Sequence, residues 1–161
     1  MFRQMRRFKQ LLTEEETENI LRSVFSGTLA LHGDEGYPYA VPMNFVYANG
    51  NIYFHSALSG HKADSIKRND KACFSVVSRA DNLPEKLTAL YKSVTVFGRI
   101  SFIEDAAEKR NAIYMLAKKY SPDLSEEAIQ EEIDGSFSRL GMLKLQIEHK
   151  TGKQSIELTK E

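Results

Sequence analysis

The stretch from Gly36 to Lys71 constrains the fold of this chain more than any other, because it combines a strand pattern, a turn and a helix start. Its first half alternates apolar and other side chains, with the apolar set at Tyr39, Val41, Met43, Phe45 and Tyr47. Asn49-Gly50 then supplies the positive φ angles that a tight turn demands, and residues 52–54 form a return strand. The sequence therefore predicts a β-hairpin around which the rest of the chain is organised.

Pro42 lies inside the first strand of this hairpin. Proline has no backbone N–H and cannot donate a hydrogen bond to a neighbouring strand. The strand is therefore expected at the edge of a sheet, at a bulge, or beside something other than a strand. A bound ligand would satisfy the last condition.

The segment that follows the return strand, residues 55–62, brings hydroxyls, a glycine and a lysine together just before a short helix predicted at residues 63–69. The first amides of a helix have no intrahelical partner, and the helix dipole is positive there. Ser56 or Ser59 and the ammonium of Lys62 are placed to close around an anion. The pattern favours a phosphate group at this helix start.

The remaining elements follow from periodicity, caps and turns. Helices are predicted after Thr13, after Asp105 and after Ser125. The inner face of the first helix carries Ile20, Leu21 and Val24. In the second helix, Glu108 occupies the capping-box position. Strands are predicted at Thr28 to His32, Ala72 to Ser78, Tyr91 to Ile103 with a bulge at Gly98, Leu143 to Ile147, and Gln154 to Leu158 after a turn at Gly152. Asp81, Asn82 and Pro84 indicate a loop. About seven strands and three or four helices predict an antiparallel barrel or sandwich with helices packed outside.

Length and charge limit the classes of protein to which the chain can belong. From its length of 161 residues we expect one domain spanning 1–161. The chain has 22 Lys and Arg residues and 22 Asp and Glu residues, so no global basic field favours binding to nucleic acid. The longest apolar runs fall far short of the ~20 residues of a membrane span, and we expect a cytoplasmic protein without membrane contact. Cys73 is the only cysteine, and the four histidines show no metal-motif spacing, so no metal site is expected.

Several motifs together resemble the flavin-binding split-barrel superfamily, the pyridoxamine 5'-phosphate oxidase-like proteins, and most closely its nitroimidazole-resistance branch. The most specific are Tyr53-Phe54-His55-Ser56-Ala57 and Gly60-His61-Lys62, supported by Tyr39 to Phe45 and by Met5-Arg6-Arg7. The resemblance covers nearly the whole chain. It implies a mainly β fold with flanking helices, a six- to seven-stranded antiparallel split β-barrel that binds FMN.

The resemblance also implies a site. The cofactor-binding residues would be Val41, Pro42, Met43, Asn44, Phe45, His55, Ser56, Ala57, Gly60, His61, Lys62 and Ser93. Backbone groups of the Val41 to Phe45 strand, with the Asn44 amide, would bond the flavin ring, and Lys62 would bind its phosphate. His55 would be the catalytic residue, delivering a proton with an unperturbed pKa near ~6.5. From the residues alone, a strand-end His55 bonded to backbone and a solvent-facing His61 are the default interpretations.

The implied function is an FMN-dependent oxidoreductase that passes electrons from a reduced nicotinamide, NADH or NADPH, to a small acceptor such as a nitroaromatic. The alternatives are a pyridoxamine 5'-phosphate oxidase-related protein without oxidase activity, since the C-terminal KQSIELTKE lacks a basic signature for the substrate phosphate, and a non-catalytic module that binds FMN or haem. We expect a homodimer with the flavin at the subunit interface, because Tyr39, Phe45, Tyr47 and Tyr53 exceed what one core absorbs. Ser93 would then reach the flavin of the partner.

Overall fold

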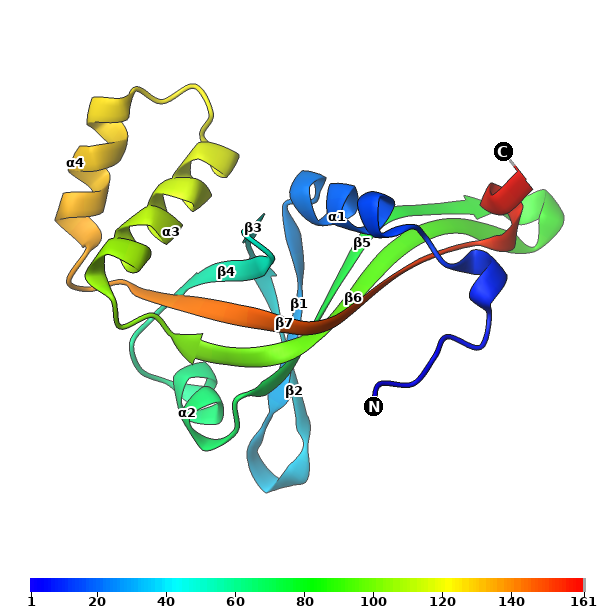
Figure 1. Ribbon diagram of the computed structural model, residues 1–161, viewed down its shortest axis with the longest axis horizontal. Helices are drawn as coiled ribbons and strands as arrows, with labels where there is room; N and C mark the ends of the chain where they lie inside the picture. The colour runs from blue at the N-terminus through cyan, green and yellow to red at the C-terminus, as the bar shows by residue number, and fades with distance from the viewer. Residues whose placement is uncertain (161) are drawn as a thin grey trace.

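The computed structural model describes residues 1–160 (Figure 1). The strands are β1 (Ser26–His32), β2 (Pro38–Asn44), β3 (Val46–Ala48), β4 (Asn51–Ser56), β5 (Lys71–Leu83), β6 (Thr88–Phe102) and β7 (Gly141–Gln154). The α-helices are α1 (Glu14–Ser23), α2 (His61–Arg68), α3 (Ala106–Tyr120) and α4 (Glu126–Ser136). Short 3-10 turns are η1 (Phe8–Gln10), η2 (Asp34–Gly36), η3 (Pro84–Lys86) and η4 (Ile156–Lys160).

All seven strands pair antiparallel in one sheet of order β2-β1-β5-β6-β7-β4-β3. The two edge strands, β2 and β3, are separated in the chain by Phe45 alone. A sheet whose two edges are joined by one residue must curl until those edges meet. This arrangement confirms the predicted antiparallel split barrel, and β2, which carries Pro42, lies at an edge as predicted.

Two hydrophobic clusters occupy the two faces of the curled sheet. The larger lies inside the barrel, where Phe45, Phe54 and Phe74 are fully buried and meet edge to face. The smaller lies outside, where Val46, Tyr53 and Met142 pack under α3 and α4. In Figure 1 these two helices stand together beyond β4 and β7, on the side away from the β5–β6 ribbon.

These clusters correct the expectation that the aromatic side chains of this region need a second subunit to cover them. Phe45, Tyr47 and Tyr53 are only 0%, 7% and 4% exposed, and Tyr39 packs against the barrel core. A single chain absorbs them because the sheet has two covered faces instead of one. The aromatic residues of this region therefore give no evidence for a dimer.

Helix α1 closes one end of the barrel and begins as predicted. The Thr13 side chain accepts a bond from the Glu16 amide, and the Glu16 carboxylate accepts one from the Thr13 amide. Ile20 and Leu21 reach the barrel core. Asp105 and Ser125 also cap their helices. Glu108 does not complete a capping box, because its carboxylate binds the Lys144 ammonium at 2.7 Å instead.

The predicted hairpin is wrong in one respect. The continuous strand expected from Tyr39 to Tyr47 breaks at Phe45, so β2 pairs with β1 and only β3 pairs with β4 across the Asn49-Gly50 turn. Both turn residues have positive φ, 51° and 70°, as predicted. The tyrosine at the end of α3 holds the break, because the hydroxyl of Tyr120 accepts a bond from the Phe45 amide at 2.9 Å.

Other boundaries also differ from those predicted. The loop expected at Asp81 and Asn82 is the end of β5, because these residues pair with β6 in a long ribbon that turns only at η3. The bulge near Gly98 is confirmed. Gly152 is not a turn but lies within β7, and up to residue 160 no separate strand follows it. A Cβ there would lie 2.3 Å from the hydroxyl of Thr17, so glycine is needed for α1 to pack on the sheet.

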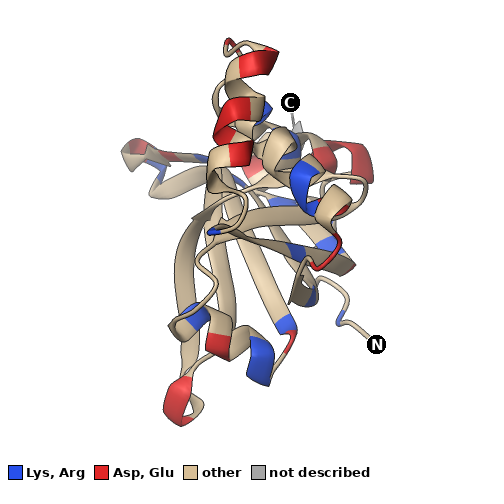
Figure 2. Cartoon of the chain, turned by 90° about the vertical axis from the view of Figure 1, so that its left-hand side faces the viewer, with Lys and Arg blue, Asp and Glu red and all other residues tan. Residues whose placement is uncertain are grey.

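Figure 2 shows basic and acidic residues interspersed along the chain, with acidic residues concentrated along α4. Within residues 1–160, no helix is long and apolar enough to cross a membrane. In the same range, no three His, Cys, Asp or Glu side chains are grouped in a way that would hold a metal ion.

Candidate functional site

The start of α2 leaves a set of backbone donors available. Gly60 precedes the helix with φ at 107°, and a Cβ added there would meet nothing within 4 Å. The first helical hydrogen bond runs from the Asp64 amide to the Gly60 carbonyl, so the amides of residues 61–63 precede the ladder. No side chain caps them. Helix α2 begins two residues before the predicted Ala63, which places Lys62 within its first turn.

Lys62 is the cation in the first turn of α2, which also carries Asp64. Its half-buried ammonium lies 3.2 Å from the sulfur of Met43 on the edge strand β2. Among residues 1–160, no carboxylate lies within ion-pair distance of this ammonium. Burial lowers the pKa of Lys62 from its ordinary value, because the charged form loses solvation. A thioether is a weak acceptor, so the charge remains available to an anion.

His55 and Asn44 line one pocket of about 370 Å³ between the sheet and α3. His55 comes from the end of β4, where it lies opposite Met142 of β7. Asn44 comes from the end of β2, on the face opposite Met43 and Phe45. The other walls are largely apolar, from α3, α4 and the segment before β7: Ile113, Leu116, Ala117, Tyr120, Glu132, Ser136, Leu140 and Met142.

The ionisation of His55 differs from the prediction. Desolvation lowers its pKa below the ordinary value of 6.5, and the positive charge of Lys62 lowers it further. The expectation of an unperturbed pKa is therefore wrong. The sequence shows neither the partial desolvation of the His55 ring nor its closeness to the Lys62 ammonium, and these two effects cause the difference. Both effects favour the neutral imidazole over the imidazolium.

The structure thus brings together four of the predicted site residues, Met43, Asn44, His55 and Lys62, where the ends of β2 and β4 meet α2. Val41 and Pro42 lie on the same edge strand, and Pro42 is exposed beside it. Phe45 contributes its backbone at the break between β2 and β3. Its ring lies in the barrel core.

Three predicted residues are placed differently. The Ser56 side chain is 3% exposed and donates to the carbonyl of Ala57, so its hydroxyl points inside. The His61 ring stacks on Tyr39 at 4.1 Å and lies 3.3 Å from the Asp34 carboxylate, away from His55. The backbone amide of His61 still belongs to the helix start. Ala57 is exposed in the loop before α2.

Ser93 is not near His55 within one chain. It lies in β6 opposite Val77 and Lys153, whereas the end of β6 close to the site is Phe102, opposite Leu143. Nine residues of extended strand, roughly 30 Å, separate the two positions. A role for Ser93 at this site therefore requires a second copy of the chain.

Sequence reasoning missed the wall that α3 provides. The sequence predicts the helix after Asp105, but nothing local indicates that its apolar positions Ile113, Leu116, Ala117 and Tyr120 cover the pocket with His55. Lys119 was missed as well. Its ammonium donates to the carbonyl of Val24 at 2.6 Å and lies 4.0 Å from the centre of the Phe45 ring, and burial lowers its pKa to about 8.

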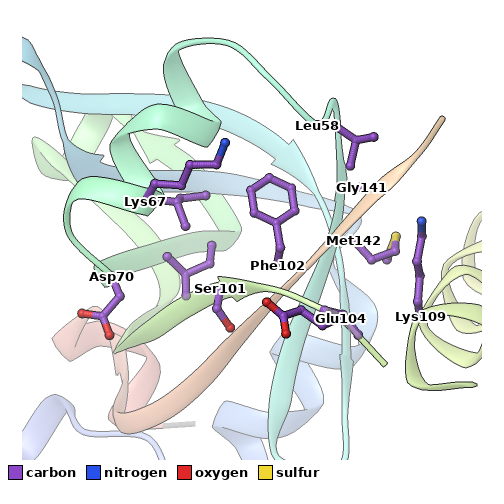
Figure 3. Close-up of a pocket in the computed structure, with 12 residues that line it drawn as sticks. Leu58, Lys67, Asp70, Ser101, Phe102, Glu104, Lys109, Gly141 and Met142 are labelled. Carbon is purple, nitrogen blue, oxygen red and sulfur yellow. The ribbon is translucent and has the colours of Figure 1, made fainter. Parts of the chain in front are cut away.

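A second pocket, of about 450 Å³, also has Met142 in its lining (Figure 3). The apolar residues Phe102 and Leu58 and the charged residues Lys67 and Glu104 are among those that line it. No residue of the predicted site lines this pocket. The shared residue Met142 makes it a neighbour of the pocket with His55.

A family model described as pyridoxamine 5'-phosphate oxidase matches residues 13–154. The chain belongs to the pyridoxamine 5'-phosphate oxidase family. The matched residues include β1 to β7 and all four α-helices of this family member, and with them every residue of the predicted site. A search of curated proteins found no significant match.

Solved structures of similar proteins support the same assignment. A putative 5-nitroimidazole antibiotic resistance protein from Bacteroides thetaiotaomicron is 26% identical, with a TM-score of 0.74 over 89% of this chain and 86% of that one. A conserved hypothetical protein from Mycobacterium tuberculosis, 17% identical, has a TM-score of 0.83 over 96% and 92%. A FAD-binding protein from Mesorhizobium loti, 20% identical, has a TM-score of 0.62 over 91% and 97%. The last two show the fold alone.

Proposed function

We propose that this member of the family is an FMN-binding reductase. The observation that carries the proposal is the Lys62 ammonium, which is half-buried and lies at the start of α2, where no side chain of residues 1–160 caps the helix. Within the same residues, its only partner is the Met43 sulfur. A buried charge without a counterion is costly, and a bound phosphate would remove that cost. The 26% identity to a structure of a nitroimidazole resistance protein supports the same class.

The residues present fit a phosphorylated flavin. Lys62 and the amides of residues 61–63 would hold the phosphate, and the open space at Gly60 lets it approach the backbone. The unpaired edge of β2, from Val41 to Asn44, would bond the polar atoms of the ring. The buried hydroxyl of Ser56 is left out of this set, because it is already bonded to Ala57.

Bound FMN would supply the hydride chemistry, taking electrons from a reduced nicotinamide and giving them to a small acceptor such as a nitroaromatic. The chain orients the acceptor and moves protons. The apolar wall formed by Leu116 and Ala117 would exclude water, and the ring of His55 opens into the same pocket. As a proton donor, His55 must be protonated, so turnover should fall as pH rises through its lowered pKa.

We also propose that two copies share the flavin. Ser93 lies far from His55 in one chain, and the outward face of β5 and β6 near it exposes Val77 and Phe97, 56% and 38% accessible. A second copy packed there would cover this apolar surface and bring Ser93 toward the partner's site. Light scattering of the flavin-loaded protein tests this: about twice the 18.3 kDa chain mass is expected, and a monomer at micromolar concentration would contradict it.

The experiment that tests the function pairs binding with turnover. FMN-loaded protein is mixed anaerobically with NADH or NADPH, the loss of flavin absorption is followed, and a nitroaromatic is then added. Replacing His55 by Ala should lower turnover by about 10²-fold while FMN affinity is nearly kept. His61→Ala is the matched control, because that ring is directed to Asp34. Unchanged turnover with weakened FMN would refute the catalytic role of His55.

One observation favours a second candidate, a non-catalytic module that binds FMN or haem. The lowered pKa of His55 reduces the fraction that carries the proton to be donated, and a neutral imidazole is the form that ligates haem iron. The same experiment separates the two functions. Bound flavin that no nicotinamide reduces, in wild type and variant alike, would favour the module.

A further inference from the structure

A third pocket lies at the junction of the two chain ends, far along the sheet from His55. η1 and η4 pack against each other, Leu11 pairs with Lys153, and the amide of Leu12 bonds the carbonyl of Gly152 at 3.0 Å. The pocket measures about 360 Å³ and is lined by Arg6, Arg7, Phe8, Lys9, Gln10 and Ile156. All six residues lie outside the family match at residues 13–154. The pocket therefore lies outside the matched family region, although Arg6 and Arg7 belong to the motifs of the family resemblance.

The charge of this pocket is positive and uncompensated. Arg6, Arg7 and Lys9 carry three cations within four residues, and the first nine residues contain no carboxylate. Over residues 1–160, none of the three lies within ion-pair distance of an Asp or Glu. An isolated group of arginines and a lysine favours phosphate oxygens, which arginine binds with two parallel N–H donors.

Two buried polar atoms without partners lie at the junction of the chain ends, one in Gln10, which lines the pocket, and one in Ser155, which does not. The side-chain oxygen of Gln10, in a residue 4% exposed, accepts no hydrogen bond, and the hydroxyl of Ser155, 2% exposed, makes none. They are the two buried side-chain polar atoms in residues 1–160 that lack a partner. Ser155 directly precedes η4, so both belong to the junction of η1 and η4. A buried acceptor with no donor is unfavourable, and a hydrogen bond from a ligand hydroxyl would remove that cost.

The pocket also has apolar walls. The Phe8 ring is 71% exposed and Ile156 is 42% exposed. An aromatic ring on a surface is a platform on which a planar base can stack. The pocket thus offers cations, a buried hydrogen-bond acceptor and an aromatic face within one space.

We propose that this pocket binds a nucleotide, independently of the flavin site. Arg6, Arg7 and Lys9 would bind the phosphates, the oxygen of Gln10 would accept a bond from a ribose hydroxyl, and the base would lie against Phe8. A simple inorganic anion would use the charges but leave Gln10 without a donor. The combination of hydroxyl, phosphate and planar ring is what a nucleotide supplies.

Isothermal titration calorimetry of the full-length protein with ADP tests the proposal, with adenosine and inorganic pyrophosphate as probes of the separate parts. ADP is expected to bind more tightly than either. The double change Arg6→Gln and Arg7→Gln should weaken ADP by about 10- to 100-fold, because two charge-assisted contacts are lost. Gln10→Leu should weaken ADP but not pyrophosphate. Circular dichroism of each variant confirms that it is folded.

Two matched controls locate the binding. Arg3→Gln removes a nearby charge that does not line the pocket, and it should change ADP affinity by less than about twofold. Lys62→Met, at the flavin site, should leave ADP affinity unchanged. The proposal is overturned if ADP does not bind, if pyrophosphate binds as well as ADP, if Arg3→Gln matches the double variant, or if Lys62→Met abolishes binding. None of these results depends on flavin turnover.

Discussion

The ammonium of Lys62 lies 3.2 Å from the sulfur of Met43, which links the first turn of α2 to the edge strand β2. The contact connects two segments that carry motifs of the family resemblance, the Val41 to Phe45 strand and the Gly60 to Lys62 helix start. A thioether cannot neutralise an ammonium. The contact with Met43 therefore fixes the position of the Lys62 ammonium but leaves its charge without a counterion among residues 1–160.

The first prediction concerns that charge. Replacing Lys62 by Ala should weaken FMN by about ten- to a hundredfold, because one charge-assisted hydrogen bond to phosphate contributes roughly 1.5–3 kcal/mol. Riboflavin, which has no phosphate, should lose little affinity. Fluorescence titration measures both dissociation constants. Lys67→Ala, on the exposed side of the same helix, is the control. Equal losses for FMN and riboflavin would mean that Lys62 supports the fold and not the phosphate.

The second prediction concerns the pKa of His55. Desolvation and the charge of Lys62 keep this pKa below 6.5 in the free protein. A phosphate dianion beside Lys62 offsets the ammonium, so FMN binding should raise the His55 pKa, and riboflavin should raise it less. NMR titration of the histidine ring protons measures the change. A His55 pKa that is the same with and without FMN would place the phosphate elsewhere.

The third prediction concerns the closure of the barrel. The Tyr120 hydroxyl accepts from the Phe45 amide at 2.9 Å and lies within bonding distance of the carbonyls of Phe45 and Phe25. Tyr120→Phe leaves these backbone groups unpaired and should lower the free energy of unfolding by about 1–3 kcal/mol. Tyr114→Phe on the same helix should cost less than 1 kcal/mol, because Tyr114 bonds only the exposed Glu126. Urea denaturation measures both, and equal costs would contradict a special role for the break at Phe45.

The fourth prediction is a pH dependence of stability. Glu18 accepts bonds from Lys150, Tyr47 and Arg22, which lower its pKa from 4.5 to about 2. A carboxyl with a lowered pKa stabilises the fold above its unfolded pKa, and this contribution disappears as pH falls from about 4.5 to about 2. Glu18→Gln should therefore cost about 1 kcal/mol at neutral pH and progressively less in that window.

Urea denaturation at a series of pH values measures this difference. Glu15→Gln is the matched control in α1, because no hydrogen bond or ion pair is formed by the Glu15 side chain within residues 1–160. A cost for Glu18→Gln that stays constant from pH 7 to pH 2 would contradict the assignment of the stabilisation to the ionised carboxylate.

Local chemistry made much of the fold predictable. Asn49-Gly50 requires positive φ whatever its surroundings, Thr13 with Glu16 caps its own helix, and Pro42 excludes a central strand. The break at Phe45 was not predictable, because the alternation continues through it and the break depends on a hydroxyl 75 residues away. Gly152 was read as a turn for a similar reason. Its requirement for glycine comes from the side chain of Thr17, which is distant in sequence.

The candidate site shows the same division. His55, Asn44 and Lys62 were predicted, and the structure places them together. The pocket wall formed by α3 was not predicted. Helical periodicity identifies the apolar face of a helix, but it does not identify the surface of the sheet that this face covers. The inward hydroxyl of Ser56 was also unpredictable, because the side on which a strand residue points is fixed only when the barrel closes.

The visible absorption spectrum of the purified protein, with and without added FMN, tests the central claim most directly. If Lys62, the start of α2 and the edge strand β2 form a flavin site, the protein should show the absorption bands of an oxidised flavin and should bind FMN with loss of flavin fluorescence. A Soret band would instead identify haem. A colourless protein that leaves the fluorescence of added FMN unchanged would contradict the account.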